Sequence, residues 1–180
     1  MIGNGIGYGW QMATVATLVT GIDGSTSLHG NSEGISSAVD RKRFLARRRE
    51  SDCLIIGGNT ARADRYAKTP VPLVILSRSR PELLAINPAA HWWNLSPADA
   101  ITRAQRDFGD EILVEAGIAI ISELLSLGLI DQLELSVTAA QGGDNRITAD
   151  ELLHHFKHVE RTLVDDTIFY SCTDPIMSQK

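Results

Sequence analysis

The chain has 180 residues, a length that suits one domain with its own hydrophobic core. Hydrophobic residues make up 43% and charged residues 22%, a balance that indicates an ordinary globular protein rather than a disordered one. The net charge of −5 argues against nucleic acid as the main partner, because phosphate contacts require a basic surface.

The sequence also carries no signal for membrane insertion or export. It has no uninterrupted apolar run of about 18 residues, so we expect no membrane span. No lysine or arginine precedes Arg41, so the apolar start lacks the positive region of a signal peptide. Cys53 and Cys172 lie in apolar runs, as is typical of buried thiols in a reduced protein. We therefore expect a cytoplasmic location.

Strand and helix patterns alternate from the start of the chain. Residues 12–22 are rich in apolar and β-branched side chains and predict a strand. A helix is expected over 36–50, because Ser36 and Ser37 are good N-cap residues. Residues 53–56, CLII, form a short apolar run closed by two glycines, as expected of a strand that is buried on both faces.

The middle of the chain is less regular. Residues 71–76, VPLVIL, predict another buried strand, with a proline near its beginning where proline is tolerated. The stretch 81–97 is rich in proline, and we expect irregular structure there with room for one short strand. A helix is predicted over 97–108.

A clear change of periodicity follows. Residues 112–114 predict a buried strand, and helical spacing begins after Gly117. Gly128 is well placed to end that helix in the left-handed conformation. Polar and apolar residues then alternate over 132–138, which predicts a further strand.

The last two predicted strands, 158–164 and 167–172, form a hairpin. Short strands separated by helices predict an α/β fold with a largely parallel sheet, to which this hairpin adds an antiparallel edge. We expect a three-layer α/β/α sandwich in a single domain over 12–175, with a flexible tail at 1–11 and another at 176–180. The glycine-rich run GNGIGYG in the first tail lacks the preceding strand that a dinucleotide-binding fingerprint requires.

Glu115 and Gly117 lie where a hydrophobic strand becomes a helix. In a parallel sheet, ligands bind beyond the carboxyl ends of the strands. The free N–H groups and the positive dipole end of a helix that starts there are suited to phosphate, and glycine lets a ligand approach the backbone closely. The alternative is a solvated carboxylate beside an ordinary turn, and this stretch alone leaves both open.

Two other predicted strands are also followed by groups that can bind phosphate. The strand at 53–56 is followed by a Gly-Gly-Asn-Thr run, and the strand at 71–76 is followed by Ser77, Arg78 and Arg80. The hydroxyl and guanidinium groups that follow the strand at 71–76 suit a ribose 2′-phosphate, which favours NADP over NAD. Taken separately, the two arginines would be ordinary surface charge.

Ordered motifs across most of the chain resemble one known family. The segment LVEAGIAIISELLSLGLIDQLEL is similar to the long V-E-[GA]-G motif of the dihydrofolate-reductase-like reductase domain of bacterial riboflavin biosynthesis, which often follows a deaminase domain. Shorter motifs match that family in the same order: GIDG (21–24), GNSEGIS (30–36), GGNTARAD (57–64) and VILSRS (74–79).

This resemblance implies a dihydrofolate-reductase-like fold, a homodimer and an activity. The family transfers a hydride from NADPH to the ribose C1′ of 5-amino-6-(5-phosphoribosylamino)uracil. The implied participants in the reaction are Glu115 and Asp23, and the implied substrate contacts are Ser32, Arg48 and Glu115. The implied NADPH contacts, together with the Arg78 suggested above, are Thr60, Asp64, Ser77, Gly117, Ile118, Ala119, Ile120, Ile121 and Ser122.

Departures from the family pattern keep two other functions open. The family tryptophan is replaced by Gly34, and the family A-D-D-P motif continues here as Arg65-Tyr66 after its first Asp. The downstream arginine of the family has no counterpart, although Lys68 or Arg65 could substitute for it. The alternatives are reduction of dihydrofolate or another small heterocycle, and a nucleotide-binding protein that has lost catalysis. We predict no metal site, since His154 and His158 lack a third ligand at suitable spacing.

Overall fold

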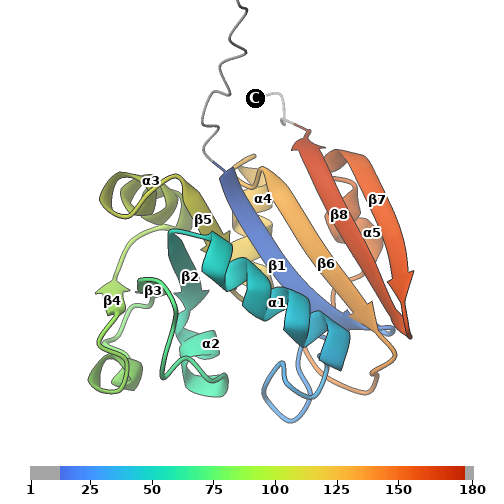
Figure 1. Cartoon of the computed structure of the whole chain (residues 1–180), viewed down its shortest axis with the longest axis horizontal. Helices are drawn as coiled ribbons and strands as arrows, with labels where there is room; N and C mark the ends of the chain where they lie inside the picture. Colours follow the sequence, from blue (N-terminus) through green and yellow to red (C-terminus); the bar gives the residue numbers. More distant parts are fainter. Residues whose placement is uncertain (1–12, 177–180) are drawn as a thin grey trace, which may run out of the picture.

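A computed structural model describes residues 13–176, which form one eight-stranded sheet between two layers of helices (Figure 1). The strand order is β4-β3-β2-β5-β1-β6-β8-β7. The strand bounds are β1 Ala13–Gly21, β2 Cys53–Gly57, β3 Leu73–Leu76, β4 Ala90–Trp93, β5 Glu111–Val114, β6 Gln132–Thr138, β7 Phe156–Val164 and β8 Thr167–Pro175.

The sheet is parallel from β4 through β6 and antiparallel at its last two pairings, β6 with β8 and β8 with β7. This confirms the predicted mostly parallel sheet with a C-terminal hairpin. The hairpin turns at Asp165, whose φ of 53° lies in the left-handed region that aspartate tolerates better than most residues. The short strand β4 occupies the stretch that was expected to hold at most one strand.

Helices cover both faces of the sheet, so the three-layer architecture is also confirmed (Figure 1). Helix α1 (Ala38–Glu50), helix α2 (Gly58–Ala63) and a 3₁₀ turn (Glu82–Ala85) lie on one face. The opposite face carries α3 (Pro97–Asp107), α4 (Ile118–Ser126) and α5 (Ala149–Leu153). The larger part of the core lies on this second face, where Ile121 and Leu124 of α4 are fully buried.

Helix ends follow the capping residues of the sequence. The hydroxyl of Ser37 accepts a hydrogen bond from Asp40 N at 3.2 Å and caps α1, so the helix begins two residues later than position 36. Gly128 has a φ of 66° and ends the α4 segment as predicted. Helix α5 was not predicted from the sequence, although Thr148 and Glu151 form a capping box at its start.

The cysteines and the helices can also be compared with the sequence predictions. Both cysteines are buried and unpaired, in agreement with the predicted core thiols. Within residues 13–176, no helix combines the length and the apolar character that crossing a bilayer requires. The predicted tail at 1–11 and residues 177–180 of the other tail lie outside the described residues.

Candidate functional site

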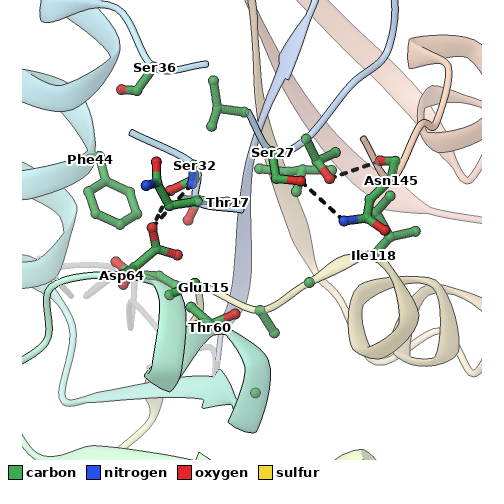
Figure 2. Close-up of a pocket in the computed structure, with 18 of the residues that line it drawn as sticks. Thr17, Ser27, Ser32, Ser36, Phe44, Thr60, Asp64, Glu115, Ile118 and Asn145 are labelled. Carbon is green, nitrogen blue, oxygen red and sulfur yellow. Dashed lines mark hydrogen bonds between the residues drawn. The ribbon is translucent and has the colours of Figure 1, made fainter. Parts of the chain in front are cut away.

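A cavity of about 900 Å³ opens between α1 and the sheet, at the carboxyl ends of β2 and β5. Its size is in the range of small-molecule and cofactor sites. Figure 2 shows its walls, with α1 and α2 on one side and the start of α4 on the other. The parallel strands place the loops that follow β2 and β5 at the same edge, as the sequence analysis expected.

The structure brings together more than half of the predicted site residues. Those that line the cavity are Ser32, Thr60, Asp64, Glu115, Gly117, Ile118, Ala119 and Ile120. The predicted residues that do not line it are Asp23, Arg48, Ser77, Arg78, Ile121 and Ser122.

Gly117 is the N-cap of α4 and presents the helix start to the cavity. Its φ of −67° is available to any residue, and a Cβ built on it meets nothing within 4 Å. Neither backbone strain nor protein packing therefore explains the glycine. The amides of Ile120 and Ile121 already bond to the carbonyl of Gly117. The preceding amides at the helix start have no carbonyl partner within the helix and can bind an anion.

Ile121, Ser77 and Arg78 do not line the cavity. Ile121 is fully buried in the core, so its side chain faces away from the cavity. Ser77 lies behind the first turn of α2, where its hydroxyl would be 2.8 Å from a Cβ added to Gly58. Because a side chain at position 58 would clash with Ser77, the glycine lets the ends of β2 and β3 approach closely. Gly58 also lines the cavity. Arg78 follows Ser77 and is exposed to solvent.

Glu115 is the centre of a buried hydrogen-bond network. Arg48 donates from Nε to Oε1 at 2.9 Å and from Nη2 to Oε2 at 2.7 Å, and the two side chains are only 8% and 2% exposed. The hydroxyl of Tyr66 donates to Oε2 at 2.8 Å. Burial raises the pKa of Glu115, and the hydrogen bonds from Arg48 and Tyr66 oppose that rise. The pKa of Tyr66 is far above its ordinary value, mainly through burial, so its phenol remains a donor.

This network changes the expectation for Arg48. The resemblance implied that its guanidinium contacts a substrate phosphate, but the structure turns it toward Glu115. The guanidinium is also held between aromatic rings, 4.3 Å from the centroid of Phe44 and 4.5 Å from that of Tyr66. Arg48 is not among the residues that line the cavity. We therefore replace the phosphate contact with a role in holding Glu115.

Tyr66 is a site residue that the sequence analysis missed. It lines the cavity, is 3% exposed, and its carbonyl accepts a hydrogen bond from the buried side chain of Asn87 at 2.8 Å. Sequence spacing gave no signal, since 49 residues separate Tyr66 from Glu115. The one clue was its replacement of the proline of the family motif.

Asp64 and Ser32 tie two walls of the cavity together. Oδ1 of Asp64 accepts hydrogen bonds from the backbone N of Ser32 at 3.2 Å and from its hydroxyl at 3.0 Å (Figure 2). Asp64 is also the C-cap of α2. It therefore fixes the loop before α1 against the end of α2, which positions both residues at the cavity.

Asp23 organises the loops beside the cavity instead of facing into it. Its carboxylate accepts hydrogen bonds from Ser25 Oγ at 2.6 Å and from Gly142 N at 2.8 Å, and it pairs with Arg146 at 3.1 Å. The Ser25 hydroxyl and the other donors lower the pKa of Asp23 to about 2. Because these partners use the carboxylate, a direct part in proton transfer has no support in this geometry.

Neither of the two substitute cations for the missing family arginine enters the cavity. Arg65 is exposed and lies 3.5 Å from Glu33, and Lys68 is exposed too. Gly34 stands where the family has a tryptophan, and the space beside it is occupied by Leu28. A Cβ added to Gly34 would be 3.0 Å from Leu28 Cβ. Leu28 therefore packs where a larger residue at 34 would begin. Among the residues that the structure describes, no group of three His, Cys, Asp or Glu side chains could hold a metal ion.

A mostly parallel sheet with a C-terminal hairpin, and a cavity at the strand ends beside a helix start, define an α/β protein of the dihydrofolate-reductase-like class. The chain belongs to the RibD C-terminal domain family, whose model matches residues 13–168.

One curated protein is similar in sequence, and solved structures are similar in fold. The chloroplastic riboflavin biosynthesis protein PYRR of Zea mays is 36% identical over 84 residues, which are 43% of this chain and 13% of the maize protein. A pyrimidine reductase-like protein of Corynebacterium diphtheriae has a TM-score of 0.67 at 16% identity, covering 92% of each chain. RibD of Acinetobacter baumannii has a TM-score of 0.70 at 18% identity, covering 93% of this chain and 59% of the other. The chain thus spans only part of the length of PYRR and of RibD.

Proposed function

We propose that this protein is an NADPH-dependent reductase that acts on 5-amino-6-(5-phosphoribosylamino)uracil. Family membership supports the reaction class, and the geometry of the β5–α4 turn supports the cofactor. The observation that carries the proposal is Gly117, where an unfilled Cβ position opens the first amides of α4 to the cavity. A diphosphate is the part of a dinucleotide that such amides bind.

In this proposal the protein supplies position and electrostatics, while bound NADPH would supply the hydride. Ile118 and Ala119, at the helix start, bind the diphosphate through their amides, and Thr60 and Asp64 contact the cofactor from α2 and its end. Ser32, whose hydroxyl donates to Asp64 at the cavity, orients the substrate. Glu115, held by Arg48 and Tyr66, lines the cavity between the cofactor and the substrate. The homodimer that the resemblance implies stays a prediction.

The direct test is NADPH oxidation by the purified protein, followed by absorbance, with 5-amino-6-(5-phosphoribosylamino)uracil and with dihydrofolate as separate substrates. The proposal expects oxidation with the aminouracil and none with dihydrofolate. The reverse pattern would assign the chain to the reduction of a different heterocycle. Saturable NADPH binding without oxidation by either compound would indicate a nucleotide-binding protein without reductase activity.

Arg78 tests the choice between the two nicotinamide cofactors. If it contacts the 2′-phosphate, Arg78→Ala should weaken NADPH binding roughly tenfold, as expected for a hydrogen bond to a charged group, and leave NADH binding unchanged. Fluorescence titration with each cofactor measures both affinities. Arg106→Ala, which removes an exposed guanidinium on α3, is the control and should change neither affinity. Equal NADPH and NADH affinities in the unmodified protein would remove the assignment.

A further inference from the structure

A row of polar side chains crosses the sheet on the face that α1 covers. The register pairs Thr17 with Glu134, and Glu134 with Ser171, so these three side chains point to the same face. On the other side of Thr17, Glu115 follows the last paired residue of β5. Thr17, Glu115 and Glu134 all line the cavity.

The two carboxylates in this row are neutralised by consecutive arginines of α1. Arg48 lies 2.7 Å from Glu115, and Arg47 lies 2.6 Å from Glu134. The hydroxyl of Ser171 donates a further hydrogen bond to Glu134 at 2.7 Å. Thr17 is therefore flanked by two ion pairs whose charges are already balanced.

The hydroxyl of Thr17 itself has no partner. Among the described residues, its Oγ1 is the one buried side-chain oxygen or nitrogen that makes no hydrogen bond. An unmet buried hydroxyl destabilises a folded protein, so such groups are uncommon. Thr17 as a whole is only partly buried and lines the cavity, so rotation about χ1 to another staggered rotamer can turn its hydroxyl toward the cavity. The hydroxyl is therefore available to a ligand that fills the cavity.

We propose that the Thr17 hydroxyl is a specificity-determining contact for the heterocyclic ring of the substrate. A hydroxyl both donates and accepts, which suits the neutral C=O and N–H groups on the edge of a uracil-like ring. A phosphate would need an unpaired cation, and the two arginines that flank Thr17 each face a carboxylate. Phe44 of α1 lines the same cavity and offers a flat apolar surface to the ring (Figure 2). This assignment rests on the proposed function, because it takes the aminouracil as the ligand.

The test compares Thr17→Val with Thr17→Ser in the full chain. Valine keeps the branched shape and removes the hydroxyl, so affinity for 5-amino-6-(5-phosphoribosylamino)uracil should fall roughly tenfold, the value of one hydrogen bond. Serine should keep an affinity close to that of the unmodified protein. Calorimetry without cofactor measures this binding and requires no turnover. NADPH affinity, measured by fluorescence, should be the same in all three proteins.

Unfolding in urea without ligand separates a ligand contact from a structural hydroxyl. Thr17→Val removes an unsatisfied group, so its midpoint should equal or exceed that of the unmodified protein. The matched control is Thr138→Val, because the buried Thr138 hydroxyl donates to the carbonyl of Ile35 at 2.6 Å and lies outside the cavity lining. That variant should have a lower midpoint and an unchanged affinity for the aminouracil.

The possible outcomes distinguish this inference from the proposed function. If the unmodified protein binds the aminouracil but oxidises no NADPH, the proposed reaction is wrong, and a tenfold loss in Thr17→Val still supports the ring contact. A Thr17→Val protein with a lower midpoint and unchanged aminouracil affinity would overturn the inference. Absence of aminouracil binding by the unmodified protein would overturn it as well.

Discussion

Arg48→Met is expected to lower the free energy of unfolding by about 3–5 kcal/mol, because it leaves the Glu115 carboxylate buried without its cation. Both side chains are almost fully buried, so solvent cannot replace the lost guanidinium. Methionine keeps most of the apolar stem of arginine, which limits the change in packing. Urea denaturation of the two proteins at neutral pH measures the difference.

Two further variants show whether the unpaired charge is the cause. Arg49→Met changes the next residue of α1, which is exposed, and should alter stability by no more than about 0.5 kcal/mol. The double variant Arg48→Met/Glu115→Leu removes both charges and should recover much of the loss. If Arg48→Met costs no more than Arg49→Met, the ion pair does not stabilise the fold and Arg48 must be reassigned.

The loss in Arg48→Met should also depend on pH in a defined direction. Burial raises the pKa of Glu115, and the variant loses the guanidinium that opposed the rise. The folded variant therefore binds a proton more tightly than its unfolded chain does. Since the folded state then holds more protons, stability falls as pH rises through the raised pKa, and the deficit should be smaller at about pH 5 than at about pH 8.

Gly117→Asp is expected to weaken NADPH binding roughly 100-fold without destabilising the protein. The new carboxylate would stand at the start of α4, where like charge opposes a diphosphate. The fold should tolerate it, because the backbone at 117 is unstrained and a Cβ there meets nothing within 4 Å. Aspartate is also a better N-cap than glycine, so the urea midpoint should stay equal or rise slightly. Fluorescence titration and urea denaturation of the same preparation measure both quantities.

Ser96→Asp is the matched control for this substitution. Ser96 is the N-cap of α3, is exposed, and lies outside the cavity lining. A carboxylate at this second helix start adds the same charge to the chain at a different place. NADPH affinity should therefore stay at its original value. Equal losses in Gly117→Asp and Ser96→Asp would mean that overall charge, rather than the α4 amides, governs binding.

Much of the fold could be predicted because its signals are local. The buried strands appear as short apolar runs closed by glycine, and Ser37 and Gly128 mark helix ends through their own backbone chemistry. Helix α2 escaped prediction because it begins at Gly58, directly after another glycine, where a turn is the ordinary expectation. Its short length gives no room for helical periodicity to appear.

The sequence could predict which strand ends meet at the site, but not how each side chain is oriented there. Parallel pairing of β2 with β5 brings Thr60 and Gly117 to one edge, which a sequence pattern can foresee. The direction of Arg48 could not be foreseen, since α1 has basic residues around much of its surface and no continuous apolar stripe to fix its rotation. The contact of Tyr66 with Glu115 depends on the path of a loop after α2, which no local pattern encodes.

The central claim is that the turn between β5 and α4 binds the diphosphate of NADPH through main-chain amides. Titration of ¹⁵N-labelled protein with NADPH, followed by amide chemical shifts, tests this contact residue by residue. We expect saturable shifts that are largest at Gly117, Ile118 and Ala119. In Gly117→Asp, the shifts of Ile118 and Ala119 should need roughly 100-fold more NADPH. Saturation of signals elsewhere, with the amides of this turn unmoved, would contradict the account.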